Sequence, residues 1–138
     1  MAYFGKINTV SILFAFLFFA ALELMVNTYR LSRLLNVEVS VVVDVSIILL
    51  GIWLAGGVIV CYLFITRWLE KRKSDYFTVI LWFPYFILMT SIFVFLFPIH
   101  HPADDPAPVL GFVIIGGLIV YPAILAFIIC ISHNVRKR

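Results

Sequence analysis

The chain has 138 residues, of which 64% are hydrophobic and 12% charged, with a mean hydropathy of +1.16 and a formal net charge of +3. Soluble domains are about 45–50% apolar and about 25% charged, so this composition excludes an ordinary water-soluble protein and predicts an integral membrane protein. The basic residues are too few, and lack the polar aromatic surface, for a nucleic-acid-binding protein.

Four apolar stretches predict an all-α fold, a bundle of four transmembrane helices near residues 8–29, 45–68, 76–97 and 109–132. Each stretch approaches the ~20 residues that a helix needs to cross a hydrocarbon core of about 30 Å. The first stretch is longer than the apolar part of a secretory signal and lacks a clean Ala-x-Ala site, so we expect a retained anchor. The bundle uses nearly the whole chain, which predicts one domain over residues 1–138.

Polar side chains interrupt the apolar pattern where the first predicted helix ends. Glu23, Asn27 and Arg30 follow an i, i+4, i+7 spacing, which places them along one helical stripe. Asp44 precedes the second predicted helix by about one turn, where a carboxylate complements the helix dipole. We predict an outer polar cluster of these four residues. Because charge at membrane depth is costly, a proton- or cation-binding role for Glu23 and Asp44 is the alternative to capping and snorkelling.

The segment from Thr28 to Val45 is neither plainly apolar nor plainly a loop. It either extends the first helix outward or lies flat on the bilayer surface with its leucines facing inward. Residues 37–41 alternate between apolar and polar side chains, as in a strand, but an isolated strand has no pairing partner here. The sequence leaves these alternatives open.

Small residues concentrate in the second and fourth predicted helices. Lipid tails are as apolar as the side chains, so close approach through small residues has to hold membrane helices together. We therefore expect these two helices to make the tightest contacts, within one chain or between copies. The predicted packing residues are Gly51, Ala55, Gly56, Gly57, Gly111, Gly116 and Gly117.

Two prolines lie inside predicted membrane helices, Pro84 in the third and Pro122 in the fourth. Each lacks an amide donor and frees the carbonyl four residues earlier, so we predict a kink at both positions. Freed carbonyls at a broken helix can coordinate a cation in a transporter, but no acidic residue lies near either proline in the sequence. The prolines are therefore interpreted as bends.

The predicted outer hairpin at residues 98–108 combines four prolines with two histidines and two aspartates. Imidazole and carboxylate groups are ligands for metals such as zinc and copper. Adjacent histidines point in different directions unless the backbone turns sharply, so we predict a stiff, solvated turn and no metal site. The candidate ligands, if the hairpin did bring them together, are His100, His101, Asp104 and Asp105.

The positions of lysine and arginine predict the orientation, because cytoplasmic loops collect these residues. With the amino terminus inside, the inner side holds eight of them and the outer side only Arg30 and Arg33. Both termini are therefore expected in the cytoplasm, in a plasma membrane of the bacterial inner-membrane type. The inner basic residues are Lys6, Arg67, Lys71, Arg72, Lys73, Arg136, Lys137 and Arg138.

The sequence contains no catalytic or cofactor motif, so we predict neither an enzyme nor a bound cofactor. The favoured function is non-catalytic: a small inner-membrane protein that assembles through its helices with itself or with a larger membrane partner. Accessory, sensor and immunity proteins share this size and layout, which is an analogy of architecture alone. The alternative is a homo-oligomeric channel or transporter for an ion or small solute, with Glu23, Asn27 and Asp44 at its entrance.

Overall fold

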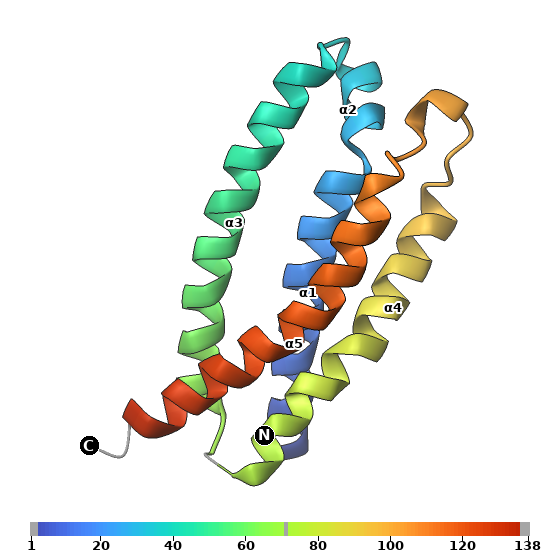
Figure 1. Ribbon diagram of the computed structural model, residues 1–138. Helices are drawn as coiled ribbons and strands as arrows, with labels where there is room; N and C mark the ends of the chain where they lie inside the picture. The colour runs from blue at the N-terminus through green and yellow to red at the C-terminus, as the bar shows by residue number, and fades with distance from the viewer. Residues whose placement is uncertain (1–2, 71, 136–138) are drawn as a thin grey trace.

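Helices make up all the regular secondary structure in the part of the chain that the computed structural model describes, residues 3–70 and 72–135. Four long helices run side by side (Figure 1): α1 (Tyr3–Val26), α3 (Val39–Trp68), α4 (Thr78–Leu96) and α5 (Val109–Val135). The connecting pieces are α2 (Thr28–Leu35), η1 (Lys73–Phe77) and η2 (Pro102–Asp104). Helices α1, α3, α5 and the continuous η1–α4 segment are each long and apolar enough to cross a membrane. The chain is thus all-helical with the makeup of a multi-pass membrane protein, as predicted.

The start of α1 and the end of α5 lie at the same end of the bundle (Figure 1). We call this the terminal end, and η1 lies there too. The opposite end, which carries α2 and η2, is called the α2 end. Helix α1 is central, since it packs most extensively against α4, next against α3, and also touches α5.

The observed helix boundaries differ most from the predicted ones between the first two spans. The second span begins at Val39 rather than near residue 45, and the first ends at Val26. The segment at 28–45 is therefore a short helix, a turn and the first two turns of α3, and residues 37–41 do not form a strand. At 30 residues, α3 is about 45 Å long, which exceeds the ~30 Å of a hydrocarbon core.

Asn36 produces the turn between α2 and α3. Its φ of 53° is in the left-handed region, which asparagine tolerates better than most residues. The amide of Val37 donates to the carbonyl of Ser32 (3.1 Å), and the Ser32 hydroxyl donates to the Val37 carbonyl (2.6 Å). The first bond satisfies the Ser32 carbonyl in the last turn of α2, and the second holds the turn against the helix as the chain reverses.

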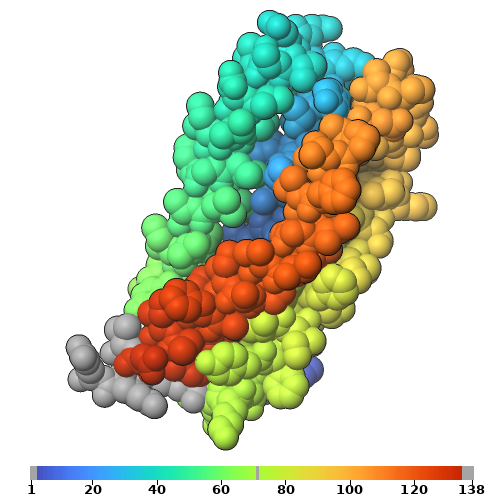
Figure 2. Space-filling view, viewed as in Figure 1, coloured from blue at the N-terminus to red at the C-terminus, as the bar shows by residue number. Residues whose placement is uncertain are grey.

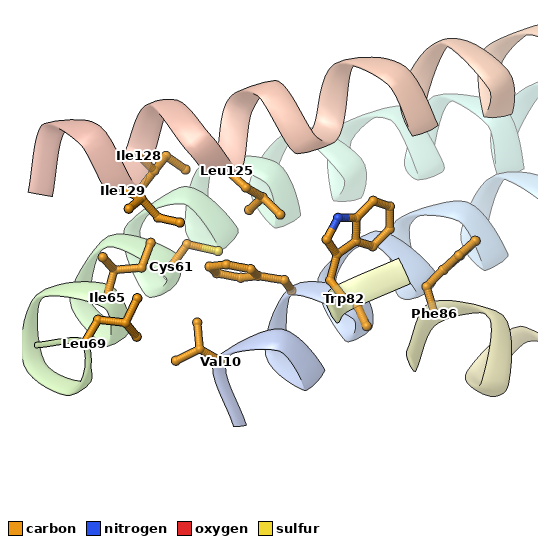
Figure 3. Packing of buried hydrophobic residues seen from close by; sticks show 11 residues of the cluster. Val10, Cys61, Ile65, Leu69, Trp82, Phe86, Leu125, Ile128 and Ile129 are labelled. Atoms are coloured by element: carbon orange, nitrogen blue, oxygen red, sulfur yellow. The ribbon is translucent and has the colours of Figure 1, made fainter. Parts of the chain in front are cut away.

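The buried core lies mainly in the half of the bundle nearer the terminal end. Val10 and Phe14 of α1 have no exposed surface, and side chains from α3, α4 and α5 surround them (Figure 3). The Trp82 ring of α4 packs edge-on against Phe18 and Tyr121, with centroid distances of 5.4 and 4.9 Å. Such aromatic pairs stabilise beyond their buried area, by about 0.5–1.5 kcal/mol each.

Helices α3 and α5 are packed less closely in the half nearer the α2 end. The space-filling view shows a hollow between them, with α1 visible at its base (Figure 2). The bundle is therefore closed at the terminal end and open on one side toward the α2 end.

Candidate functional site

The predicted outer polar cluster is only partly assembled. The Asn27 side-chain amide donates to Glu23 Oε2 at 2.8 Å and to the Glu23 carbonyl at 2.9 Å. Arg30 instead donates to the carbonyl of Phe97 at 3.0 Å. Asp44 lies within the second turn of α3 and is exposed, so it does not precede its helix as predicted. Only Glu23 and Asn27 are brought together.

The main polar contact at the α2 end joins Arg33 of α2 to Asp104 of η2. Arg33 Nε lies 2.7 Å from Asp104 Oδ1, and the terminal nitrogen lies 2.6 Å from Oδ2, which is a bidentate pair. The Asp104 side chain is only 3% exposed. The Arg33 hydrogen bonds lower the pKa of the Asp104 carboxyl, and the same pair raises the pKa of Arg33. This contact, the Arg33–Asp104 pair, ties the α1–α3 connection to the α4–α5 connection.

In the hairpin that was considered as a metal site, two of the four candidate ligands make hydrogen bonds within the chain. Both Asp104 oxygens accept from Arg33, and His101 Nδ1 accepts from the amide of Ala103 at 3.3 Å. Within the described ranges, no three histidine, cysteine, aspartate or glutamate side chains gather as metal ligands. His100 and Asp105 are exposed on the hairpin surface.

A second polar cluster, which the sequence analysis missed, lies at the terminal end around Asp75 of η1. The Asp75 side chain is fully buried. Its Oδ1 accepts from the Tyr3 hydroxyl at 2.6 Å, and its Oδ2 accepts from the Arg72 backbone amide at 3.0 Å and lies 3.0 Å from His133 Nε2. We call this set the Asp75 cluster. It joins η1 to the first turn of α1 and the last turns of α5.

Charged side chains surround the Asp75 cluster at the surface. Glu70 accepts from Lys6 at 3.0 Å and pairs with Arg72 at 2.8 Å, and these partners lower the pKa of the Glu70 carboxyl. The Arg72 guanidinium also lies over the Tyr3 ring, 4.9 Å from its centroid. Arg67 and Lys73 are exposed at the same end. The other predicted inner basic residues, Lys71, Arg136, Lys137 and Arg138, lie outside the described residues.

The predicted packing residues separate into two groups. A side chain added at Gly57 or Gly117 would meet α1: Leu17 Cδ2 at 3.5 Å and Phe18 Cζ at 3.1 Å, respectively. The others are exposed, and the glycines among them have no atom within 4 Å of an added Cβ; they are Gly51, Ala55, Gly56, Gly111 and Gly116. Within one chain the most extensive contact is between α1 and α4, so α3 and α5 do not form the tightest pair there.

Pro84 lies inside α4 and Pro122 inside α5, and neither proline ends its helix. Figure 1 shows the axis of α5 changing direction between its orange and red parts, the stretch that holds Pro122. The bend brings the last turns of α5 across the terminal end, toward α3 and η1. The bend therefore places His133 beside Asp75. The sequence alone did not predict this contact.

The hollow between α3 and α5 contains a cavity of about 370 Å³, which we call the α3–α5 cavity. Its base is α1, and its walls include Gly57 of α3 and Gly117 of α5. The residues that line it, all of them described, include no charged side chain. The cavity thus offers an almost entirely apolar surface.

Comparison of the chain with models of known protein families, with curated proteins and with solved structures finds no match. A function for this protein is therefore inferred from the geometry of the described residues.

Proposed function

We propose that this protein works by non-catalytic assembly within a bacterial inner membrane, through the face of α3 that carries Gly51 and Ala55. The partner is a second copy of the chain or a larger membrane protein. The observation that supports this most directly is that, apart from the adjoining backbone of α3 and the two residues next to Gly51, no atom of the described chain lies within 4 Å of a Cβ placed at Gly51. A glycine that serves the fold of its own chain would have a neighbour there.

The surroundings of Gly51 and Ala55 suit a partner helix. Small residues four apart leave a shallow groove in which another helix backbone can approach closely. Ile48 and Ile52, which are 62% and 66% exposed, form a ridge along one side of this groove. Asp44 precedes Gly51 by seven residues, which places its exposed carboxylate near the same helical face, where it can set the register of a partner.

We further propose that the terminal end faces the cytoplasm. Among the described residues, Lys6, Arg67, Arg72 and Lys73 all lie there, whereas the α2 end holds two basic residues, Arg30 and Arg33. Single cysteines at two exposed positions test this in a chain whose own cysteines are replaced. A membrane-impermeant thiol reagent added to intact cells should label Ala103→Cys and leave Lys73→Cys unlabelled. The reverse labelling would overturn the orientation.

Bulky substitutions on the α3 face test the assembly. Gly51→Leu and Ala55→Leu point away from the chain's own atoms, so the fold should be unchanged while the partner is excluded. Ala123→Leu on the exposed surface of α5 is the matched control. Association is measured by native mass spectrometry in mild detergent and by cross-linking in native membranes, with the melting temperature as the check on folding.

We expect the oligomer or the co-purifying membrane protein to be lost in the two α3 variants and retained in Ala123→Leu. Association that survives both α3 substitutions in folded protein would refute the proposed face. A wild-type chain that is monomeric and cross-links to nothing in native membranes would refute the assembly function itself.

A further inference from the structure

The α3–α5 cavity has the shape of an elongated slot. Its lining runs from Leu17 to Val26 along α1, from Leu50 to Cys61 along α3 and from Leu110 to Ile128 along the bent α5, which are rises of about 14, 17 and 27 Å at the helical spacing. The hollow between α3 and α5 is visible toward the α2 end (Figure 2). One leaflet of a bilayer has about half of the ~30 Å hydrocarbon thickness, so the slot is long enough to hold an extended chain that enters from the α2 end.

The chemistry of the walls excludes a polar ligand. Two side chains that line the cavity could donate hydrogen bonds, but both already donate to backbone carbonyls of α1. Trp53 Nε1 donates to Leu17 at 2.9 Å, and the Tyr121 hydroxyl donates to Phe14 at 2.7 Å. Cys61 and Met25 add sulfur atoms, which are weak hydrogen-bonding groups. An occupant therefore gains contact only through hydrocarbon.

The volume of the cavity suits a single hydrocarbon chain. An apolar cavity of about 150 Å³ in another protein holds one benzene ring of six carbons. On that scale the cavity of about 370 Å³ holds roughly fifteen carbons, the size of one acyl chain. An empty slot of this size would leave its walls without dispersion contacts on one side, and apolar cavities do not attract water. A flexible hydrocarbon chain fits the volume and the apolar walls, and the surrounding bilayer supplies it in excess.

We propose that one acyl chain of a membrane phospholipid occupies the α3–α5 cavity, with its headgroup outside the cavity near the α2 end. The chain fills the space between α3 and α5 and keeps these helices apart. Neither Gly51 nor Ala55 lines the cavity. Substitutions in the cavity therefore test its occupancy separately from the proposed assembly.

Tryptophan quenching by a phospholipid brominated on its acyl chains tests this site. The full chain is purified in detergent, stripped of lipid, and titrated with dibrominated phosphatidylcholine. The signal of Trp53, which lines the cavity, is isolated by subtracting the quenching seen in Trp53→Phe. Two variants fill the slot from opposite walls, Gly57→Phe on α3 and Val113→Phe on α5. Ala123→Phe adds the same ring on an exposed position outside the cavity, and helical circular dichroism checks the fold of each variant.

We expect Trp53 quenching to saturate at a single lipid per chain in the wild type and in Ala123→Phe. The saturable phase should disappear in both cavity-filling variants, and native mass spectrometry should show the matching loss of a retained lipid. Quenching that rises without saturation, or that persists unchanged in a folded cavity-filling variant, would overturn the proposal. Quenching that vanishes as the wild type self-associates would overturn it in favour of a second copy covering the slot.

Discussion

The two ends of the bundle are each held by a buried aspartate, but they differ in what lies beneath it. At the terminal end, the Asp75 cluster covers a continuous core and joins three helical elements. At the α2 end, the Arg33–Asp104 pair joins two connections above helices that are separated by the α3–α5 cavity. Similar chemistry therefore fixes the bundle itself at one end and only its connections at the other.

The difference indicates where the molecule is rigid. A region with many buried apolar contacts opens only with global unfolding, whereas a region held by a few polar contacts opens locally. The terminal end belongs to the first kind and the α2 end to the second. The cavity and the exposed α3 face thus lie toward the end that can adapt to a lipid or a partner.

Removing the Asp75 carboxylate should have the largest effect. Asp75→Ala leaves the Tyr3 hydroxyl and the Arg72 amide without their acceptor and removes the contact to His133. Breaking a buried charge network by deleting one member costs roughly 3–5 kcal/mol. We expect a correspondingly lower midpoint for unfolding in sodium dodecyl sulfate and a lower melting temperature in mild detergent.

Two other aspartates are the controls for this substitution. Asp104→Ala should lower the melting temperature less than Asp75→Ala, because it frees the connections and leaves the core in place. Asp105→Ala removes an exposed carboxylate and should change nothing measurable. Equal effects of Asp75→Ala and Asp104→Ala would show that the two ends are equally coupled to the core.

Breaking the Arg33–Asp104 pair should open the α2 end locally. Asp104→Asn keeps the size of the side chain and removes its charge, and Arg33→Lys keeps the charge and removes the bidentate geometry. In both variants we expect faster amide hydrogen exchange in α2 and around η2, with exchange in η1 and the start of α4 unchanged. Faster exchange throughout the bundle would contradict the idea that this end opens independently.

Acid should also open the α2 end locally, because it protonates Asp104. The pKa of Asp104 is lowered in the folded chain, so the unfolded chain binds the proton more readily. The stabilisation from the Arg33–Asp104 pair is thus fully present above the ordinary aspartate pKa of about 3.9 and is lost as the pH falls through the lower, folded value. Exchange in α2 should rise in that window in the wild type, and Asp104→Asn should show no such rise. A rise beginning at neutral pH would assign the effect to another group.

The spans were predictable because hydrophobic length alone decides whether a helix can cross a bilayer. The contacts between spans were not, since they join residues far apart in the sequence: 72 positions separate Tyr3 from Asp75, and 71 separate Arg33 from Asp104. Arg33 and the hairpin that holds Asp104 were both predicted on the outer side, so a search for opposite charges on one side would have found Arg33 and Asp104 as candidates. Nothing in the sequence indicates that the bend of α5 brings His133 to Asp75.

The sequence also did not show which of the small residues face the other helices of the chain. Lipid and protein interior are both apolar, so hydrophobicity does not tell which face of a membrane helix is buried. The sequence analysis therefore grouped Gly51 with Gly57, although Gly51 lies at the surface and Gly57 beside Leu17. Helical periodicity could not show which of the two glycines is buried, because that depends on where α1 lies.

The two inward glycines provide the smallest and most local comparison, between a position on α3 that faces Leu17 and one on α5 that faces the Phe18 ring. Interior glycine costs a helix up to about 1 kcal/mol relative to alanine. At Gly57 an added methyl would make ordinary contact with Leu17 at 3.5 Å, so Gly57→Ala should gain most of that stability.

At Gly117 the added methyl would lie 3.1 Å from Phe18 Cζ and 3.2 Å from Phe18 Cε2. The Phe18 ring cannot easily withdraw, because Trp82, Phe86 and Tyr121 pack around it at centroid distances of 5.4, 5.2 and 4.9 Å. We therefore expect Gly117→Ala to gain nothing or to lose stability in the same detergent unfolding assay. An equal gain at both positions would mean that the aromatic cluster around Phe18 yields to an added methyl group as readily as Leu17 does.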